Sequence, residues 1–538
     1  MPVPAPFSAI DRAAGRFRAA LTDSARAERA VLVALGIYLL VWTAYGTIAK
    51  SSQGLHADMT ELIAWSRDLS LGYLKHPPLA AFMVRAWFTV FPVAEWSYYL
   101  LAMLMPVTAL WIAWRLSADY LDLEKRVLGL ALLTFVPFFN FHALKFNVNT
   151  VLMPLWAATA FAFLRAYRTR APLWAALAGL AAAAAMLGKY WSVFLVAGLV
   201  VAALIDRRRI AYFRSPAPWI TVSVGLVALA PHLLWLVQHD FAPFTYAVAV
   251  HGEKTFSAAL LSTVGYLGGS LAYVAVPLVV VLAILFRSSP RKRGSRAGNA
   301  DSVALDPRLR GNERRMGAAF SVLADIAWPP DGERRLVAAA FWAPLLLPVA
   351  GALIGRSEIT SLWSMPCWTL LPGLLLSSPA VTVRAIDTRR VLIAAAALPF
   401  VMLIVSPAIA IVAQRKGPPP ASAQAALLAR EVERLWHETT PQPLKFVGGD
   451  ADLAYGVITY APDEPRALPN LPPPAAAELA RSGMVLVCFV EDGNCRRRAE
   501  ASASGVAGSR TVVSDIARGF LGYLGKAQSY AIVLVPPR

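Results

Sequence analysis

The chain has 538 residues, of which 57% are hydrophobic and 16% charged, and it carries a formal net charge of +18. This composition excludes an ordinary soluble enzyme. Apolar runs of about 17–25 residues, each long enough to cross a bilayer, recur along most of the chain. Arginines cluster in the short loops between these runs, which is typical of cytoplasmic loops rather than of a nucleic-acid surface.

Residues 1–28 carry arginines among apolar side chains and are expected to form a basic amphipathic segment on the cytoplasmic membrane surface. Residues 29–413 are predicted to form a transmembrane domain whose first span, at 30–49, is an uncleaved anchor. Further spans are predicted at 78–93, 97–116, 127–143, 148–166, 172–188, 190–205, 218–237, 258–286, 335–354, 364–379 and 390–413. Counting spans up to Arg165 gives the wrong parity, so one segment is re-entrant or one run hides two short helices. About 11–13 helices are predicted in all.

Two further segments differ in character. Residues 288–333 are polar, lack a helical or strand period, and are predicted to form a dispensable, disordered cytoplasmic insertion. Residues 414–538 follow a proline-rich linker and contain a helical pattern, AQAALLAREVERLWHE, and short β-type runs, LKFVGG, GVITYA, MVLVCFV and SYAIVLV. The predicted fold is therefore an all-α polytopic membrane protein with a small extracytoplasmic α/β domain, expected to cover the outer mouth of the membrane domain.

The chain has three cysteines. Cys488 and Cys495 can form a disulfide if the C-terminal domain is extracytoplasmic. Zinc binding is the weaker alternative, because no second pair of ligands lies nearby. Cys367 lies in an apolar span and is interpreted as packing.

The loop over 49–77 concentrates charged and aromatic residues between two apolar spans. Asp58 and Glu61 are spaced (i, i+3), which places both carboxylates on one face of a helical turn. A helix cap and a solvated acid explain the same spacing. Lys75 and His76, in LKHPPL, would lie at the outer interface and could hold a phosphate. Snorkelling to the headgroups is the alternative, and position alone favours it.

Other polar residues gather at the ends of the spans that are predicted to face outward. They are His142, Lys145, Asn147, Asn149, Lys189, Tyr190, His232, Gln238, His239, Asp240, Arg356 and Glu358. Ionisable residues at membrane depth are costly and usually mark a site. The pattern predicts one outward-opening polar cavity, basic enough for an anionic ligand.

These motifs resemble the integral membrane glycosyltransferases related to protein O-mannosyltransferases and lipid A aminoarabinose transferases, a family 39-like group of type C architecture. ADMTELIAWS and GYLKHPPL follow the family's order and spacing, with Asp58 on the family's aspartate. Met59 stands where the family has an adjacent glutamate, and Glu61 falls on a tyrosine position. The resemblance extends over roughly residues 30–410.

Later segments carry the same resemblance. LGKYW places Lys189 on the family's lysine, and PHLLWLVQHDFAPF is similar to a family segment with the same Trp, Gln-His and Phe spacing. In FNVNTVLMPLW, Asn149 replaces an aspartate, and RSEITSLWSMP is similar to a late segment that ends in Trp-x-x-Pro.

The resemblance implies transfer of a sugar from a polyprenyl-phosphate donor to a hydroxyl of lipid A, a glycan, a lipid or a protein. The reaction is expected at the periplasmic face of the bacterial inner membrane, as an inverting hexosyl or pentosyl transfer without a cofactor or a metal. Asp58 and Glu61 are the expected catalytic residues. The expected donor-phosphate ligands are Lys75, His76, Lys189, Tyr190 and Arg356, and the expected cavity-lining residues are Tyr73, Asn147, Asn149, His239 and Trp363.

Two other functions remain open from the sequence. A transporter or flippase of a lipid-linked or anionic solute would show internal repeats and broken helices in matching halves, and no convincing repeat is evident. A membrane-anchored sensor would place its active part in the tail.

Overall fold

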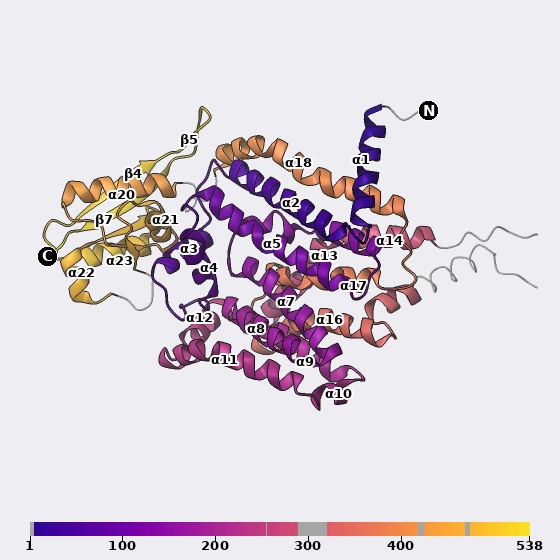
Figure 1. The fold of residues 1–538 in the computed structure, drawn as a ribbon. Coiled ribbons are helices and arrows are strands. Elements are labelled where there is room, and N and C mark those ends of the chain that lie inside the picture. The colour runs from indigo at the N-terminus through magenta and orange to yellow at the C-terminus, as the bar shows by residue number, and fades with distance from the viewer. Residues whose placement is uncertain (1–4, 254, 289–319, 418–423, 469–473) are drawn as a thin grey trace, which may run out of the picture.

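The computed structural model describes residues 5–253, 255–288, 320–417, 424–468 and 474–538. A bundle of helices forms most of the molecule, and a small domain of strands and helices caps one end of it (Figure 1). The bundle contains α1 (Ala5–Leu21), α2 (Ala27–Ala49), α3 (Ala57–Arg67), α4 (Leu79–Phe88), α5 (Glu95–Ser117), α6 (Leu123–Leu133), η1 (Pro137–Phe139), η2 (His142–Leu144), α7 (Val148–Thr169), α8 (Pro172–Gly188), η3 (Tyr190–Ser192), α9 (Val193–Ile205), α10 (Arg209–Phe213), α11 (Ala217–Gln238), α12 (Ala242–His251), α13 (Phe256–Tyr273), α14 (Ala275–Ser288), α16 (Gly332–Gly355), η4 (Ser361–Leu370), α17 (Leu371–Leu376) and α18 (Ala385–Lys416).

The described residues contain six helices that are long and apolar enough to cross a membrane, or eight segments if each of two bent pairs counts as one span. Four shorter apolar helices accompany them, which brings the apolar segments into the predicted range of about 11–13. The chain is thus a multi-pass membrane protein. Its predicted spans at 127–143 and 258–286 are broken, with bends of 80° and 58°.

The predicted span at 78–93 does not cross the bundle. Its helix, α4, has 10 residues, a length of about 15 Å, or half of the hydrocarbon core. The Trp87 indole near the end of α4 donates to the Ser97 carbonyl at the start of α5 (3.1 Å). Glu95, also at the start of α5, accepts a hydrogen bond from Tyr460 of the C-terminal domain (3.1 Å). The loop before α4 is held to α3 by the Tyr73 hydroxyl, which donates to the Trp65 carbonyl (2.9 Å). Both ends of α4 therefore lie at the end of the bundle that the C-terminal domain caps, which resolves the parity conflict.

The opposite end of the bundle, here called the arginine end, collects the arginines of four loops. Arg165 binds Asp119 (2.7 Å), and Arg287 binds Asp387 (2.5 Å). The remaining pairs are Arg208 with Glu333 and Arg389 with Asp11. This grouping agrees with the alternation of sides that the charge pattern predicts.

The predicted insertion at 288–333 lies mostly outside the described residues, although residues 320–327 near its end are helical.

The C-terminal domain contains α20 (Ala425–Thr439), β1 (Phe446–Gly449), α21 (Ala451–Tyr460), β2 (Arg466–Ala467), α22 (Ala476–Ser482), β3 (Met484–Phe489), α23 (Gly493–Ala503), β4 (Arg510–Ile516), β5 (Gly519–Phe520), β6 (Tyr523–Leu524) and β7 (Gln528–Val535). Its main sheet has the order β2-β1-β3-β7-β4. β1 is parallel to β2 and β3, whereas β7 is antiparallel to β3 and β4. Cys488, in β3, and Cys495, in α23, form a disulfide.

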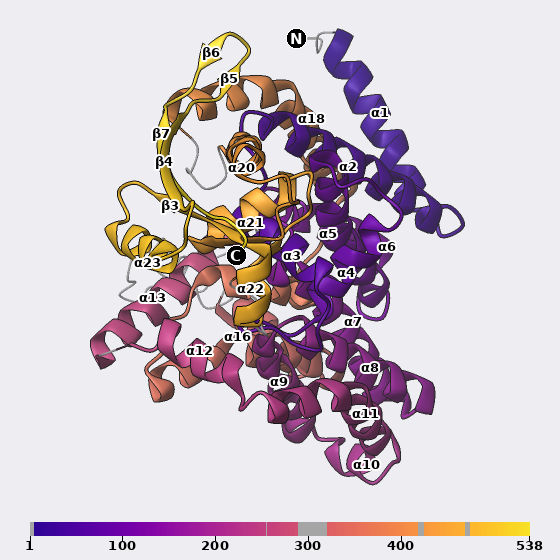
Figure 2. The same cartoon turned by 90° about the vertical axis from the view of Figure 1, so that its left-hand side faces the viewer.

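One predicted strand is wrong. The run GVITYA belongs to helix α21, which starts at Asp450, whose side chain accepts from the Leu453 N–H (3.0 Å). This cap and burial between α3 and the sheet outweigh the β propensity of its branched residues (Figure 2). Strand β4 was not predicted, because as an edge strand it is largely exposed and has few apolar residues.

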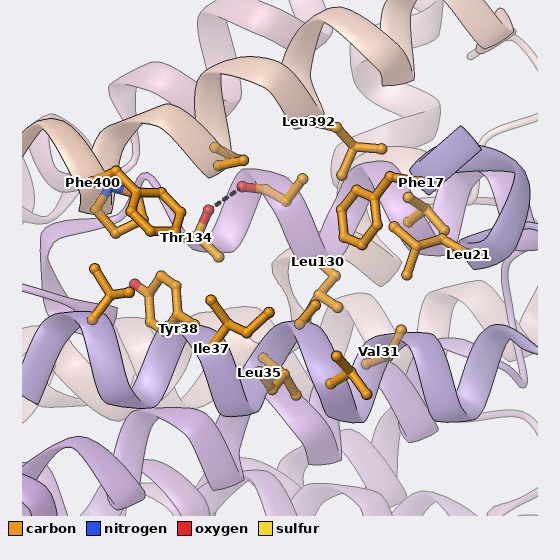
Figure 3. Close-up of a pocket in the computed structure, with 18 residues that line it drawn as sticks. Phe17, Leu21, Val31, Leu35, Ile37, Tyr38, Leu130, Thr134, Leu392 and Phe400 are labelled. Carbon is orange, nitrogen blue, oxygen red and sulfur yellow. Dashed lines mark hydrogen bonds between the residues drawn. The ribbon is translucent and has the colours of Figure 1, made fainter. Parts of the chain in front are cut away.

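An apolar cavity of about 250 Å³ lies between α1, α2, α6 and α18. Figure 3 shows side chains from all four helices around it. Its two hydroxyl groups are engaged elsewhere, since Thr134 donates to the Ala131 carbonyl (2.7 Å) and Tyr38 to the Phe139 carbonyl (3.0 Å). The cavity offers no chemistry of its own, and the reactive groups lie elsewhere.

Candidate active site

The site begins at α3, the short helix that follows the first span. His56 caps this helix by accepting from the Asp58 N–H through Nδ1 (3.1 Å). Apolar side chains of α3, such as Met59, Leu62 and Ile63, are buried and anchor it on the bundle. The predicted helical turn is thus present, and its carboxylates differ in setting. The Asp58 side chain is 41% exposed, whereas Glu61 is buried.

The Asp58 carboxylate lies at the N-terminus of α7. Asn147 caps this helix, because its Oδ1 accepts from the N–H groups of Asn149 (3.0 Å) and Thr150 (3.2 Å). With Oδ1 so engaged, the Nδ2 group points away from the helix and donates to Asp58 Oδ2 (2.9 Å). The partial positive charge of the helix terminus also favours an anion here. One amide therefore both starts α7 and orients Asp58.

The Lys145 ammonium and the His56 ring complete the surroundings of Asp58. Lys145 Nζ lies 3.2 Å from Oδ2, and His56 Nδ1 lies 3.5 Å from Oδ1. Burial alone would raise the pKa of Asp58, but Lys145, His56 and the Asn147 hydrogen bond together lower it below its usual value. Asp58 is therefore ionised at neutral pH. Lys145 belongs to the polar residues singled out in the sequence, but no motif indicates its contact with Asp58.

Glu61 forms a separate pair with Lys75. The Lys75 ammonium donates to Glu61 Oε1 at 2.6 Å. Burial raises the pKa of Glu61 to about 7; Lys75 opposes this rise, and Asp58 and Asp452 add to it. Glu61 thus exchanges a proton near neutral pH, and its ionised form holds Lys75.

Lys189 lies in the break between α8 and η3. Its ammonium donates to Asn149 Oδ1 (2.8 Å) and lies over the Trp363 ring, 4.5 Å from the centroid. Burial lowers the pKa of Lys189 to about 7, while Asp58 raises it and Lys145 lowers it further. Lys189 contacts Asn149, whose N–H binds the same Asn147 side chain that donates to Asp58. Residues from three motifs therefore meet at one place.

His76 and Tyr73 have less direct positions. Burial, with Lys189 and Lys75 nearby, lowers the pKa of His76 to about 3, so its ring is neutral at pH 7. The Tyr73 hydroxyl donates to the Trp65 carbonyl (2.9 Å), and the two rings stack 4.7 Å apart. Tyr73 thereby holds the loop between α3 and α4 against α3, and its hydroxyl is directed to the main chain.

A second network joins the loop to α11. His232 Nδ1 lies 2.6 Å from the Leu71 carbonyl, which can only accept, so Nδ1 carries the proton. In the neutral ring Nε2 then accepts from the Tyr190 hydroxyl (3.0 Å). Beside it, Gly72 packs so closely on Trp235 that a Cβ atom would lie 2.4 Å from the indole. These contacts hold Leu71 and Gly72, at the start of the GYLKHPPL motif, against the PHLLWLVQHDF segment.

The remaining predicted residues lie around this centre. His239 stacks on Trp235 with ring centroids 4.2 Å apart, and its Nδ1 faces the Trp235 carbonyl. Arg356 ends α16 with a φ of 46°, and its carbonyl accepts from Glu253 N (2.7 Å), while its side chain is exposed. The segment after Arg356 leads into η4, where the Trp363 ring lies against the Lys189 ammonium. The His251 ring packs edge to face on Trp363.

The C-terminal domain is fastened over α3 through α21 (Figure 2). The Arg67 guanidinium donates to the Ile458 carbonyl (2.5 Å), and the Tyr460 hydroxyl accepts from Leu55 N (3.1 Å). Asp452, in the first turn of α21, acts electrostatically on both Glu61 and Lys75. The domain therefore adds charge to the site, a contribution that no motif signalled because the family-like pattern ends before it.

The chemistry available here is that of one ionised carboxylate surrounded by ammonium groups. Asp58 can accept a proton from a hydroxyl group. Lys145, Lys189 and Lys75 can stabilise a phosphate or another developing anion. These groups lie at the end of the bundle opposite the arginine end, away from the basic loops (Figure 1).

Comparison with known proteins shows which family part of the chain resembles. Residues 75–235 match the family model described as dolichyl-phosphate-mannose-protein mannosyltransferase. The match includes Lys75, Lys145, Asn147 and Lys189. The resemblance to type C glycosyltransferases that the motifs predict is thereby confirmed over this part of the chain.

A curated relative and two solved structures are also similar. The lipid A galacturonosyltransferase RgtD of Rhizobium johnstonii is 29% identical over 179 residues, which are 33% of this chain and 37% of the relative's length. ArnT from Cupriavidus metallidurans bound to undecaprenyl phosphate has a TM-score of 0.47 and 14% identity, covering 93% of this chain and 97% of that chain. The oligosaccharyltransferase AglB from Archaeoglobus fulgidus has a TM-score of 0.39 and 12% identity, covering 84% of this chain and 69% of that chain.

Proposed function

We propose that the protein is a glycosyltransferase that moves a sugar from a polyprenyl-phosphate donor to a hydroxyl acceptor. The observation that carries this proposal is the Asp58 carboxylate, held ionised by Asn147 and Lys145 with Lys189 close by. The matching family model supports the reaction class. The active site and the C-terminal domain face the periplasm in this proposal, because the arginine end has the charge of a cytoplasmic face.

In the proposed reaction, Asp58 takes the proton of the acceptor hydroxyl while that oxygen attacks the anomeric carbon. The bond between the anomeric carbon and the phosphate oxygen breaks, and its electron pair leaves with the polyprenyl phosphate. Attack opposite to the leaving group inverts the anomeric centre. The donor is a phosphodiester, and the polyprenyl phosphate monoester that leaves is already a stable anion, so the reaction requires preorganised cations more than a strong acid.

The roles of the surrounding residues follow from their positions. Lys189 and Lys75 bind the donor phosphate, and neutral His76 and Tyr190 serve as hydrogen-bonding groups beside them. Asn147, Asn149, His239 and Trp363 shape the substrate cavity, with Arg356 at its rim and Tyr73 in the folding of its loop. Glu61 competes with the donor phosphate for the Lys75 ammonium, because the two side chains form an ion pair.

The relative's name suggests a specific substrate pair, a galacturonic acid unit and lipid A. A uronic acid carries a carboxylate, which suits a site with several ammonium groups. Mannose and aminoarabinose donors are the alternatives to test beside it.

The decisive variant is Asp58→Asn, assayed with the full-length protein in liposomes and with each polyprenyl-phosphate sugar donor in turn. Loss of the general base should lower the transfer rate about 10²–10⁴-fold. Asp122→Asn is the matched control, because Asp122 caps α6 through Lys125 N at the arginine end and asparagine caps equally well. Transfer by Asp58→Asn at the rate of the control would refute the proposal. Mass spectrometry of lipids from cells lacking the protein would identify the donor as the species that accumulates.

A further inference from the structure

A group of three metal-binding residue types lies in the C-terminal domain, outside the proposed active site. Glu433 and His437 are spaced (i, i+4) on α20 and so share one face of that helix. Asp463 follows the end of α21. One ligand atom from each residue lies within 4.8 Å of the other two.

Their contacts fix the orientation of each group. His437 Nε2 lies 3.2 Å from Glu433 Oε2 and 3.1 Å from Asp463 Oδ2. The other oxygen of Glu433 accepts from Asp463 N (3.1 Å), and Asp463 Oδ2 also accepts from Leu444 N (2.6 Å). The main chain thus holds both carboxylates in place, each turned toward the same imidazole nitrogen.

The spacing of these atoms fits a tetrahedral zinc ion. Zinc bonds of about 2.0–2.1 Å in tetrahedral geometry separate ligand atoms by about 3.3 Å. Two of the three separations, 3.1 and 3.2 Å, are close to this value, and the third is within 4.8 Å. One imidazole and two carboxylates form a mixed nitrogen and oxygen ligand set, which suits Zn²⁺ better than Ca²⁺ or Mg²⁺.

We propose that Glu433, His437 and Asp463 form a binding site for Zn²⁺, with water as the fourth ligand. The Glu433 side chain is 10% exposed and forms the floor of the site, whereas the His437 side chain is 45% exposed and leaves an entry path for the ion. The ion neutralises two carboxylates that otherwise share one imidazole nitrogen and accept main-chain N–H groups besides.

The zinc site would connect α20 to the turn after α21, the helix that holds the C-terminal domain against the membrane domain. α20 supplies two ligands, and the turn after α21 supplies the third. α21 also carries the Ile458 carbonyl and the Tyr460 hydroxyl that hold α3 and Leu55. Zinc would therefore stabilise the domain where it is fastened over the Asp58 loop, independently of the reaction proposed for that loop.

The test measures zinc bound to the full-length protein in detergent, after removal of any affinity tag, treatment with a chelator and dialysis against ZnCl₂. We expect one equivalent per chain by mass spectrometry of the metal, and a visible absorption band of tetrahedral geometry when Co²⁺ replaces zinc. Glu433→Gln with His437→Gln should weaken zinc binding at least tenfold. The matched control, Glu438→Gln, lies on the same helix and pairs with Arg434, and it should keep wild-type binding.

Thermal unfolding gives a readout that does not depend on the variants folding identically. Chelator should lower the unfolding temperature of the wild type and of Glu438→Gln, and added zinc should restore it. No zinc in the wild type would overturn the proposal and leave only the hydrogen bonds of His437 to the two carboxylates. Equal zinc content in the ligand variants and the control would overturn it as well.

Discussion

The dual role of Asn147 leads to a prediction that separates the stability of α7 from the orientation of Asp58. Asn147→Ser keeps a good cap for α7, because serine and asparagine are similarly favoured at this position. Its shorter side chain cannot reach Asp58, so the 2.9 Å hydrogen bond to the carboxylate is lost. Asn147→Ala loses both the cap and the hydrogen bond.

The size of the effect follows from the setting of Asp58. A hydrogen bond to a charged group contributes about 1.5–3 kcal/mol. Since the Asp58 side chain is 41% exposed and retains Lys145, the lower end applies. About 1.5 kcal/mol of lost transition-state stabilisation corresponds to a rate about tenfold lower. The missing cap in Asn147→Ala should cost about 1 kcal/mol of stability in addition.

The assay measures sugar transfer in liposomes and thermal unfolding in detergent for both variants and the wild type. We expect Asn147→Ser and Asn147→Ala to be slowed equally, about tenfold, and only Asn147→Ala to unfold at a clearly lower temperature. A wild-type rate for Asn147→Ser would show that the hydrogen bond does not orient a reacting group. A rate for Asn147→Ala far below that of Asn147→Ser would show that helix stability, rather than orientation, controls activity.

Two further predictions concern the ionisable groups. Lys189, with a pKa of about 7, is a cation below that pH and neutral above it, so kcat/KM should fall above pH 7 toward a limit of about tenfold per pH unit. Lys189→Arg should extend the plateau to higher pH, since arginine stays protonated; an unchanged midpoint in the pH profile would assign the titration to another group. Glu61→Gln removes the partner of Lys75, and should lower KM for the donor severalfold if Lys75 then binds phosphate without competition. A lower kcat with unchanged KM would instead give Glu61 a part in the chemical step.

Much of the fold could be predicted because its causes are local. Span lengths, loop arginines and the cap and turn residues of α3 are properties of short segments, and the observed helices follow them. The two wrong predictions concern segments whose structure depends on the length of the helix or on a capping residue outside the apolar run. The run at 78–93 is apolar enough to span, but its helix ends at Phe88. The run GVITYA has β-branched residues, but Asp450 caps it as a helix.

In the candidate site, the residues could be predicted from the motifs, but their contacts could not. The motifs identified Asp58, Lys189 and Asn147 as members of one polar group, and the structure brings them together. The contact between Asp58 and Asn147 joins residues 89 positions apart, so only the folded bundle reveals it. The Asp452 charge comes from a domain that the motifs do not cover.

The short helix α4 has a practical consequence for chemical labelling. The turn that joins α4 to α5 carries Val90, which is 78% exposed, and remains at the end of the bundle that contains Asp58. Of the three native cysteines, Cys367 is buried and the other two form a disulfide. A thiol introduced by Val90→Cys would therefore react with a membrane-impermeant maleimide against a silent background. Its labelling in intact cells would report the face of the membrane on which the reactive carboxylate lies.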